Sequence, residues 1–251
     1  MNVLSLVGRM TTQKYSRWKA GHPAAPCRTP APLHLSQGAT TGLSPVPLIL
    51  AQAAGSIFPD LEAHQTVVSV GVMQLLGSTW IRSYLSDGRS FIETVADRAD
   101  PSKSAQTRLY TLHTERTPAT PDDWAFLLGA PAITQVDPET GGDTVTQEAT
   151  PALIGYRLFQ IDDPDKGAVL FSRAWQPGDT DIGPVTAVET ITDAAGVSFR
   201  ATHMLMAYSR VIGGVTEHLI AEAVETDDGA VFNASVGLDF DAAGLSVLAP
   251  A

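Results

Sequence analysis

The chain has 251 residues, a formal net charge of −11 and a hydrophobic fraction of 44%, a composition typical of a folded globular protein with a sizeable core. Five of the 16 basic residues and none of the 27 acidic residues precede Asp60, so the acidic charge is concentrated in the rest of the chain. Such an acidic surface repels phosphate backbones, and we expect no nucleic-acid partner.

The basic N-terminal segment also contains three prolines, and we predict a flexible arm over residues 1–31. Residues 32–251 are predicted to form a single β-rich domain. A division into two β subdomains at the loop of residues 135–150 is the alternative. Cys27 is the single cysteine, which excludes an internal disulfide and a thiol-based zinc site. No apolar run reaches the roughly 18 residues of a membrane-spanning helix, so we expect no transmembrane segment.

Short apolar segments at residues 33–35 and 46–51 predict a pair of lead-in strands. Residues 66–95 predict three antiparallel strands, because Gly77-Ser78 and Asp87-Gly88 both suit two-residue hairpin loops. These loops would set the following opposite pairs: Leu75 and Trp80, Met73 and Arg82, Gly71 and Tyr84, Arg82 and Glu93, Tyr84 and Phe91, Trp80 and Val95. The resulting row of Trp80, Tyr84 and Phe91 is interpreted as core, with an exposed recognition platform as the alternative.

The second half of the chain predicts more strands and one helix. Thr120 as N-cap, Pro121 in the first turn and Gly129 as a stop predict a helix over residues 121–128. A long polar loop is expected at residues 135–150. Strands are predicted at residues 106–115, 153–161, 169–175, 185–191, 197–212, 215–225 and 230–240. The predicted fold class is mainly β, an antiparallel sandwich or bent two-sheet architecture with one short helix.

His203 and His218 are the most tempting metal ligands, near Glu217 and Glu222. However, a hairpin turning at Gly213-Gly214 separates the two histidines by six residue steps, or about 20 Å. We therefore predict no metal site. An acidic run at residues 162–167 is interpreted as a turn, because it lacks the length and terminal Glu of a calcium loop. No nucleophile elbow, Walker loop, dinucleotide fingerprint or zinc-protease motif occurs, and we predict no cofactor and no catalytic residue.

One set of polar residues is a candidate binding site. An acidic cleft would be lined by Arg82, Tyr84, Asp87, Glu93 and His113. The alternative is structural: Arg82 and Glu93 form a cross-strand pair beside a turn aspartate.

The order of features resembles the uncharacterised bacterial YjfK-like family, from about residue 33 to residue 248. The similarity lies in the following residues: Pro47 and Leu48; Gly71, Leu76, Gly77, Arg82, Tyr84, Asp87 and Phe91; Tyr208, Ser209 and Arg210; Glu217 and Leu219; and Ser235, Val236, Gly237 and Leu238. The family has no established activity to carry over. The resemblance implies an accessory role beside phage-shock-type membrane-stress proteins, whose genes tend to accompany it.

Together these observations predict a non-enzymatic cytoplasmic accessory protein, peripheral at the inner membrane face. Its partner would be another protein, such as a coiled-coil membrane-stress protein whose basic surface complements the acidic body. The alternative function is a small-molecule-binding protein or enzyme with an acidic cleft. A structural subunit of an oligomer is a third reading.

Overall fold

The computed structural model describes residues 31–96, 104–129, 152–241 and 244–248, together with the strands at residues 133–136 and 143–147. All but the last residue of the predicted basic arm lies outside these described residues.

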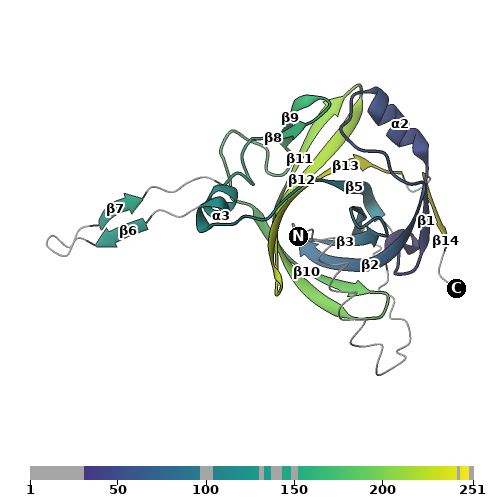
Figure 1. Cartoon of the computed structure of the whole chain (residues 1–251), viewed down its shortest axis with the longest axis horizontal. Coiled ribbons are helices and arrows are strands. Elements are labelled where there is room, and N and C mark those ends of the chain that lie inside the picture. Colours follow the sequence, from purple (N-terminus) through teal and green to yellow (C-terminus); the bar gives the residue numbers. More distant parts are fainter. Residues whose placement is uncertain are drawn as a thin grey trace.

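Eight antiparallel strands close into a barrel (Figure 1). They form two four-stranded meanders, each of which follows the chain order. The first meander contains β2 (His64–Leu75), β3 (Ser78–Leu85), β4 (Ser90–Ala96) and β5 (Ser104–Arg116); the second contains β10 (Val185–Asp193), β11 (Ser198–Ile212), β12 (Val215–Thr226) and β13 (Gly229–Asp239). Two seams join the meanders, because β2 pairs with β10 and β5 pairs with β13.

The predicted sandwich or bent two-sheet architecture is therefore wrong. In a sandwich each meander would keep two free edges, whereas here both edges of each meander are hydrogen-bonded to the other meander. At one seam Met73 lies opposite Glu189, and at the other Leu109 lies opposite Leu238. Closure satisfies the edge N–H and C=O groups of these strands within the barrel itself.

The remaining strands lie beside or outside the barrel. β1 (Thr40–Leu43) pairs with both β2 and β14 (Leu245–Leu248). β8 (Leu158–Asp163) and β9 (Gly167–Arg173) form a hairpin attached to β11. β6 (Ile133–Val136) and β7 (Asp143–Gln147) form a separate two-stranded sheet, so the polar loop predicted at residues 135–150 contains most of a hairpin.

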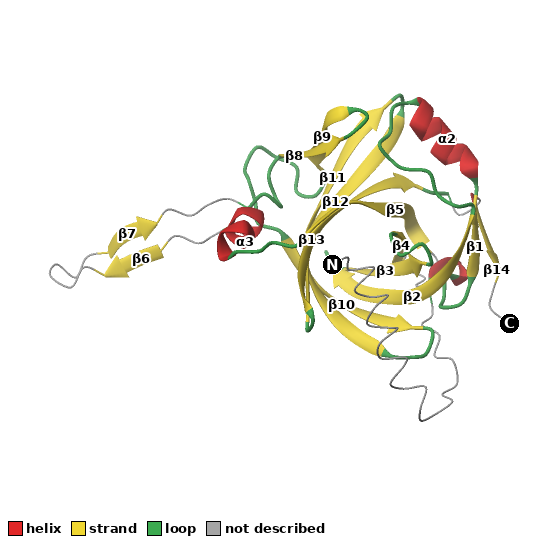
Figure 2. Cartoon of the chain, viewed as in Figure 1, coloured by secondary structure: helices red, strands yellow, loops and turns green. Residues whose placement is uncertain are grey.

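Figure 2 shows where the helices lie among these strands. α3 (Pro121–Leu128) confirms the predicted helix, with Thr120 and Asp123 forming a reciprocal capping box. Where a strand was predicted, the chain instead forms α2 (Pro45–Ala53). Its two prolines lack N–H donors, which weakens a strand but suits the first turn of a helix. A short 3₁₀ helix, η1 (Pro32–His34), replaces the other lead-in strand.

The hairpin registers agree with the predictions at two turns and differ at one. The β3–β4 register is confirmed, with Arg82 opposite Glu93 and Tyr84 opposite Phe91. The β11–β12 register is also confirmed, since His203 lies opposite Val224. The predicted β2–β3 register is wrong, because the loop is Leu76-Gly77 and Leu75 pairs with Ser78. Both loop residues have positive φ, 51° and 75°, which is the geometry of a type I′ turn.

This shift places Gly71 opposite Arg82 instead of beneath Tyr84. A Cβ at Gly71 would collide with the carboxylate of Glu189. The glycine that an aromatic ring covers is Gly237, where a Cβ would lie 2.4 Å from two ring carbons of Tyr110. Both glycines therefore leave room for a side chain inside the barrel.

The strands separate two hydrophobic layers. The outward-facing side chains pack with Leu35, Leu48, Leu127 and Phe159 of the covering elements. The opposite side chains face the barrel interior and include Trp80, Tyr84, Phe91 and Tyr110. Because Trp80, Tyr84 and Phe91 are only 6%, 2% and 2% exposed, the core interpretation of this aromatic row is confirmed. The recognition platform is excluded.

Candidate functional site

A cluster of five Arg, Glu and His side chains, contributed by five different strands, lies inside the barrel. Each occupies an inward position between two apolar inward neighbours, two residues before and two residues after it in the strand. They are Arg82 of β3, Glu93 of β4, Glu189 of β10, His203 of β11 and Glu222 of β12, and all are at most 4% exposed.

These side chains form one continuous chain of contacts across the barrel. The Tyr84 hydroxyl donates a hydrogen bond of 2.7 Å to Glu189, whose carboxylate lies 2.9 Å from Nε2 of His203. Nδ1 of His203 lies 3.0 Å from the Glu222 carboxylate. That carboxylate accepts a 2.9 Å hydrogen bond from Nη1 of Arg82, while Nε of Arg82 donates to Glu93 at 3.3 Å. We call these six residues the interior network.

Burial and pairing shift the protonation equilibria of the interior network in opposite directions. Burial alone would lower the pKa of His203, but its two carboxylate partners outweigh burial and raise that pKa to about 9. Burial favours the neutral form of Glu222, yet Arg82 and His203 lower its pKa to about 2. For Glu93, burial outweighs Arg82 and raises the pKa. At neutral pH the network therefore contains an imidazolium held between two acidic side chains.

Nε2 of His203 and of His218 each lie within ion-pair distance of a carboxylate. Besides the buried Ser69 hydroxyl, which also faces the interior, five polar atoms there have no hydrogen-bond partner among the described residues. Two are donors, Nη2 of Arg82 and Nε1 of Trp80. Three are acceptors, Oε1 of Glu93, Oε1 of Glu189 and Oδ1 of Asn233. Asn233 lies on β13 opposite Glu222 of β12, so its side chain also faces the interior. Buried polar atoms are normally paired, so these five atoms need partners that the described residues do not supply.

The structure brings together three of the five predicted site residues. Arg82, Tyr84 and Glu93 belong to the interior network. Asp87 is exposed in the β3–β4 turn, where its carboxylate accepts hydrogen bonds from the N–H groups of Arg89 and Ser90. It therefore acts as a turn residue and lies outside the network.

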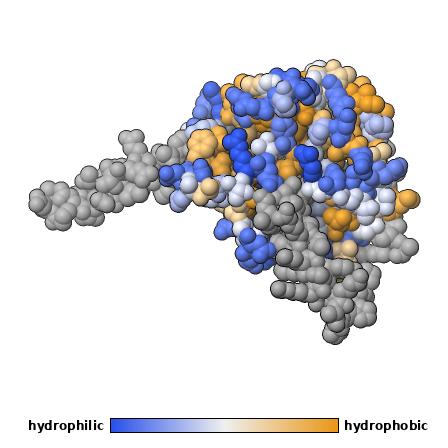
Figure 3. Space-filling view, in the orientation of Figure 1, coloured by the Kyte–Doolittle hydropathy of each residue, from blue (hydrophilic) through white to orange (hydrophobic). Residues whose placement is uncertain are grey.

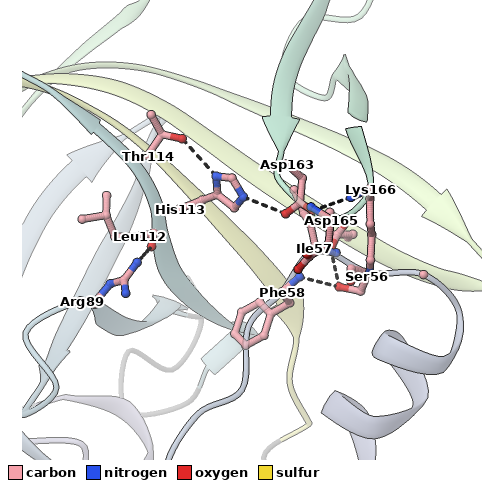
Figure 4. Close-up of polar contacts among 12 residues, drawn as sticks. Ser56, Ile57, Phe58, Arg89, Leu112, His113, Thr114, Asp163, Asp165 and Lys166 are labelled. Atoms are coloured by element: carbon pink, nitrogen blue, oxygen red, sulfur yellow. Dashed lines mark hydrogen bonds and ion pairs between the residues drawn. The ribbon is translucent and has the colours of Figure 1, made fainter. Parts of the chain in front are cut away.

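His113 lies apart from the network, at an irregularity in β5 (Figure 4). One ring nitrogen lies 3.0 Å from the Thr114 hydroxyl and the other lies 3.3 Å from the carboxylate of Asp163. Asp163 also accepts hydrogen bonds from the N–H groups of Asp165 and Lys166, which confirms that the acidic run there is a turn. His113 thus links β5 to the β8–β9 hairpin.

A second polar cluster lies on the outer face of β12. Glu217 is fully buried and accepts hydrogen bonds from the Ser56 hydroxyl, the Ile57 N–H group and Arg210. The Arg210–Glu217 pair is covered by the connection between α2 and β2. Its contacts are all satisfied by neighbouring groups, so we assign it a structural role.

Sequence reasoning missed the second half of the interior network. The sequence patterns do not single out Glu189, and they indicate His203 and Glu222 only as candidate metal ligands. In the described residues, no group of three or more His, Cys, Asp or Glu side chains could hold a metal ion. The signal that could have found them is a charged residue flanked at both i−2 and i+2 by apolar residues, which marks a charge on the buried face of a strand.

Comparison with known proteins does not assign the chain to a family. No protein-family model, curated protein or solved structure matches the chain. The resemblance to the YjfK-like family therefore stays a prediction. Among the described residues, no helix has the length and apolar character that crossing a membrane requires.

Proposed function

We propose that this protein binds a small polar molecule inside its barrel. The observation that supports the proposal is the set of five buried, unpartnered polar atoms on the inner wall, contributed by Trp80, Arg82, Glu93, Glu189 and Asn233. Eight-stranded barrels have interiors that side chains can fill or that can hold one small ligand.

A purely structural role explains the network less well. Buried ion pairs are often no more stabilising than apolar residues of similar volume. Each unsatisfied buried atom costs a further ~1–3 kcal/mol. A ligand that pairs with these atoms would offset that cost, and perturbed pKa values clustered in one place are typical of functional sites.

The free atoms also indicate the chemistry of the ligand. Three acceptors, two donors and the Ser69 hydroxyl, which can act as either, remain, so the ligand should donate more hydrogen bonds than it accepts. The interior network contains three acidic side chains, Glu93, Glu189 and Glu222, against the two basic side chains of Arg82 and His203. An amine or a polyhydroxylated molecule suits this environment better than an anion does.

Native mass spectrometry of the protein purified without denaturation tests this function. We expect a bound small molecule that denaturation releases. Asn233→Leu removes one free acceptor without touching the ionic contacts and should lower the bound fraction, whereas Thr190→Val on the exposed outer face of β10 should leave it unchanged. A wild-type mass equal to that of the bare chain, with only water beside the five atoms in a crystal structure, would contradict the proposal.

A second candidate function is protein binding, and one exposed surface favours it. Val46, Ile49 and Leu50 of α2 are 58%, 58% and 59% exposed, at the i, i+3, i+4 spacing by which helices pack together. Hydrophobic residues gather on this part of the surface in Figure 3. We propose that this stripe binds an apolar stripe on a helical partner.

Under this second proposal the protein is a non-enzymatic cytoplasmic accessory protein. Its partner is a coiled-coil membrane-stress protein at the inner membrane face, as the family resemblance implies. Pull-down at low and moderate salt, with identification of the captured proteins, tests it. Ile49→Glu should abolish capture of a coiled-coil protein, and Leu170→Glu, an equally drastic change at an exposed position of β9, should not. Recovery of no coiled-coil protein at either salt concentration counts against this function.

A further inference from the structure

A cavity of about 320 Å³ lies outside the barrel, and none of its lining residues belongs to the interior network. Its floor is the outer face of β5 and β13, including Thr114, Arg116, Phe232 and Ala234. Its roof and walls come from α3 and β8, with residues 117–119 and Leu153 completing the lining. This volume is at the low end of the range for small-molecule sites.

The inner part of the cavity is apolar. Phe159 of β8 and Phe232 of β13 stack there, with ring centroids 6.3 Å apart and an interplanar angle of 26°. Leu127, Ile161 and Ala234 are buried beside them. Phe126 of α3 lines the same cavity but is 59% exposed. An apolar ligand could therefore lie against aromatic rings while keeping one end in water.

One charged group of the lining is free to bind a ligand. Arg116 lies opposite Phe232 in the β5–β13 register, so its side chain projects from the same outer face. Within the part of the chain that the structure describes, its guanidinium makes no hydrogen bond or ion pair. A guanidinium binds a carboxylate through two parallel N–H···O hydrogen bonds.

The two acidic residues of the lining are already engaged. The Asp123 carboxylate accepts hydrogen bonds from the N–H groups of Ala119 and Thr120 and from the Thr120 hydroxyl. These bonds from the N-cap lower the pKa of Asp123. Asp162 accepts a 2.7 Å hydrogen bond from the Gln160 side chain. Both carboxylates already accept hydrogen bonds, whereas the Arg116 guanidinium is free to donate them. The cavity therefore favours an anionic ligand over a cationic one.

We propose that this cavity is a second binding site, which takes a small amphipathic carboxylate. The apolar body of the ligand packs against Phe159 and Phe232, and its carboxylate pairs with Arg116. This site does not depend on the proposed function of the barrel interior, because the two share no lining residue.

Calorimetric titration with octanoate, octan-1-ol and octylammonium tests the proposal, because the three probes share one chain length and differ in the head group. The wild-type protein should bind octanoate more tightly than either of the other two. Arg116→Gln should weaken octanoate binding by about 10- to 100-fold, the range expected for loss of a charged hydrogen bond. Arg200→Gln, at an exposed arginine of β11, should leave octanoate binding unchanged.

A second variant tests the cavity itself. Ala234→Leu adds volume to the floor and should exclude octanoate, with circular dichroism and urea denaturation verifying that the variant folds. If that variant does not fold, Phe126→Ala at the exposed edge replaces it and should weaken octanoate binding. Equal affinity for the three probes, equal loss in Arg116→Gln and Arg200→Gln, or undiminished binding in the cavity variant that folds would each overturn the proposal.

Discussion

Arg82 and Glu222 lie 140 positions apart in the sequence and form a 2.9 Å salt bridge inside the barrel, with side chains 1% and 5% exposed. This contact joins β3 of the first meander to β12 of the second. The two strands are not neighbours in the sheet order, so the pair spans the interior instead of following the wall. The barrel is therefore stabilised across its interior as well as along its hydrogen-bonded seams.

We expect Glu222→Gln to destabilise the protein strongly. The substitution leaves the buried charges of Arg82 and His203 without their shared partner, and breaking a buried ion pair in this way costs about 3–5 kcal/mol. Urea denaturation measures the change in the free energy of unfolding. Glu225→Gln, at an exposed position of the same strand, should change it by less than about 0.5 kcal/mol. Similar changes in the free energy of unfolding for the two variants would show that the interior network contributes little to stability.

The contribution of His203 to the free energy of unfolding should decrease as the pH rises. Its pKa is raised from 6.5 to about 9, so its stabilising effect is complete below pH 6.5 and is lost as the pH rises through about 9. Glu222 behaves oppositely: its pKa is lowered from 4.5 to about 2, so its effect is complete above pH 4.5 and is lost as the pH falls toward 2. Glu93, whose pKa is raised, favours the folded state most below pH 4.5.

NMR titration of the His203 ring measures this prediction directly, and the ring should still be protonated at pH 7.5. The difference in unfolding free energy between the wild type and His203→Gln should also shrink as the pH rises from 6.5 past 9. A ring that titrates near pH 6.5 would mean that Glu189 and Glu222 do not hold the proton as the geometry indicates.

Gly71→Ala should perturb the interior network, because Gly71 lies against the carboxylate of Glu189. The added Cβ would collide with Oε1 of Glu189, so the carboxylate must shift and its contacts with Tyr84 and His203 change. Overpacking of this kind costs about 1–3 kcal/mol. Thermal unfolding measures it, with Gly183→Ala as the control, since nothing lies within 4 Å of a Cβ there. An unchanged midpoint in Gly71→Ala would mean that Glu189 relaxes freely.

The capping box of α3 predicts a smaller effect. Thr120→Ala removes the hydroxyl that accepts a hydrogen bond from the Asp123 N–H group, and it should destabilise the protein by about 1 kcal/mol. Thr120→Ser keeps the hydroxyl and should restore most of that stability. Urea denaturation compares the three proteins, and equal losses in the Ala and Ser variants would point to the methyl group instead.

Local features of the fold were predictable from the sequence. Asp87-Gly88 and Gly213-Gly214 each determine a turn over a few residues, and both hairpin registers followed correctly from them. Leu76 shows the limit of that reasoning: a leucine at positive φ is uncommon, so the turn Leu76-Gly77 was assigned one residue too late. The helix α2 was missed for a different reason: a short apolar run does not distinguish a buried strand from a helix.

Barrel closure and most of the site were not predictable in this way. The seam pairs Met73–Glu189 and Leu109–Leu238 join residues far apart in the chain, and no local turn residue encodes them. The Arg82–Glu93 pair was predicted because one tight turn sets it. Its partners Glu222, His203 and Glu189 reach it only through closure, which explains why the sequence indicated half of the network.

The two seams also constrain synthesis of the protein. The first meander ends at Arg116, whereas β13, which must cover the edge of β5, begins only at Gly229. At a translation rate of about 5–20 residues per second, β5 waits several seconds on the ribosome for the strand that pairs with it. During that interval the outer edge of β5 presents unpaired N–H and C=O groups to other chains. Chaperone demand should therefore be highest just before β13 emerges, and truncated chains that lack β13 should aggregate.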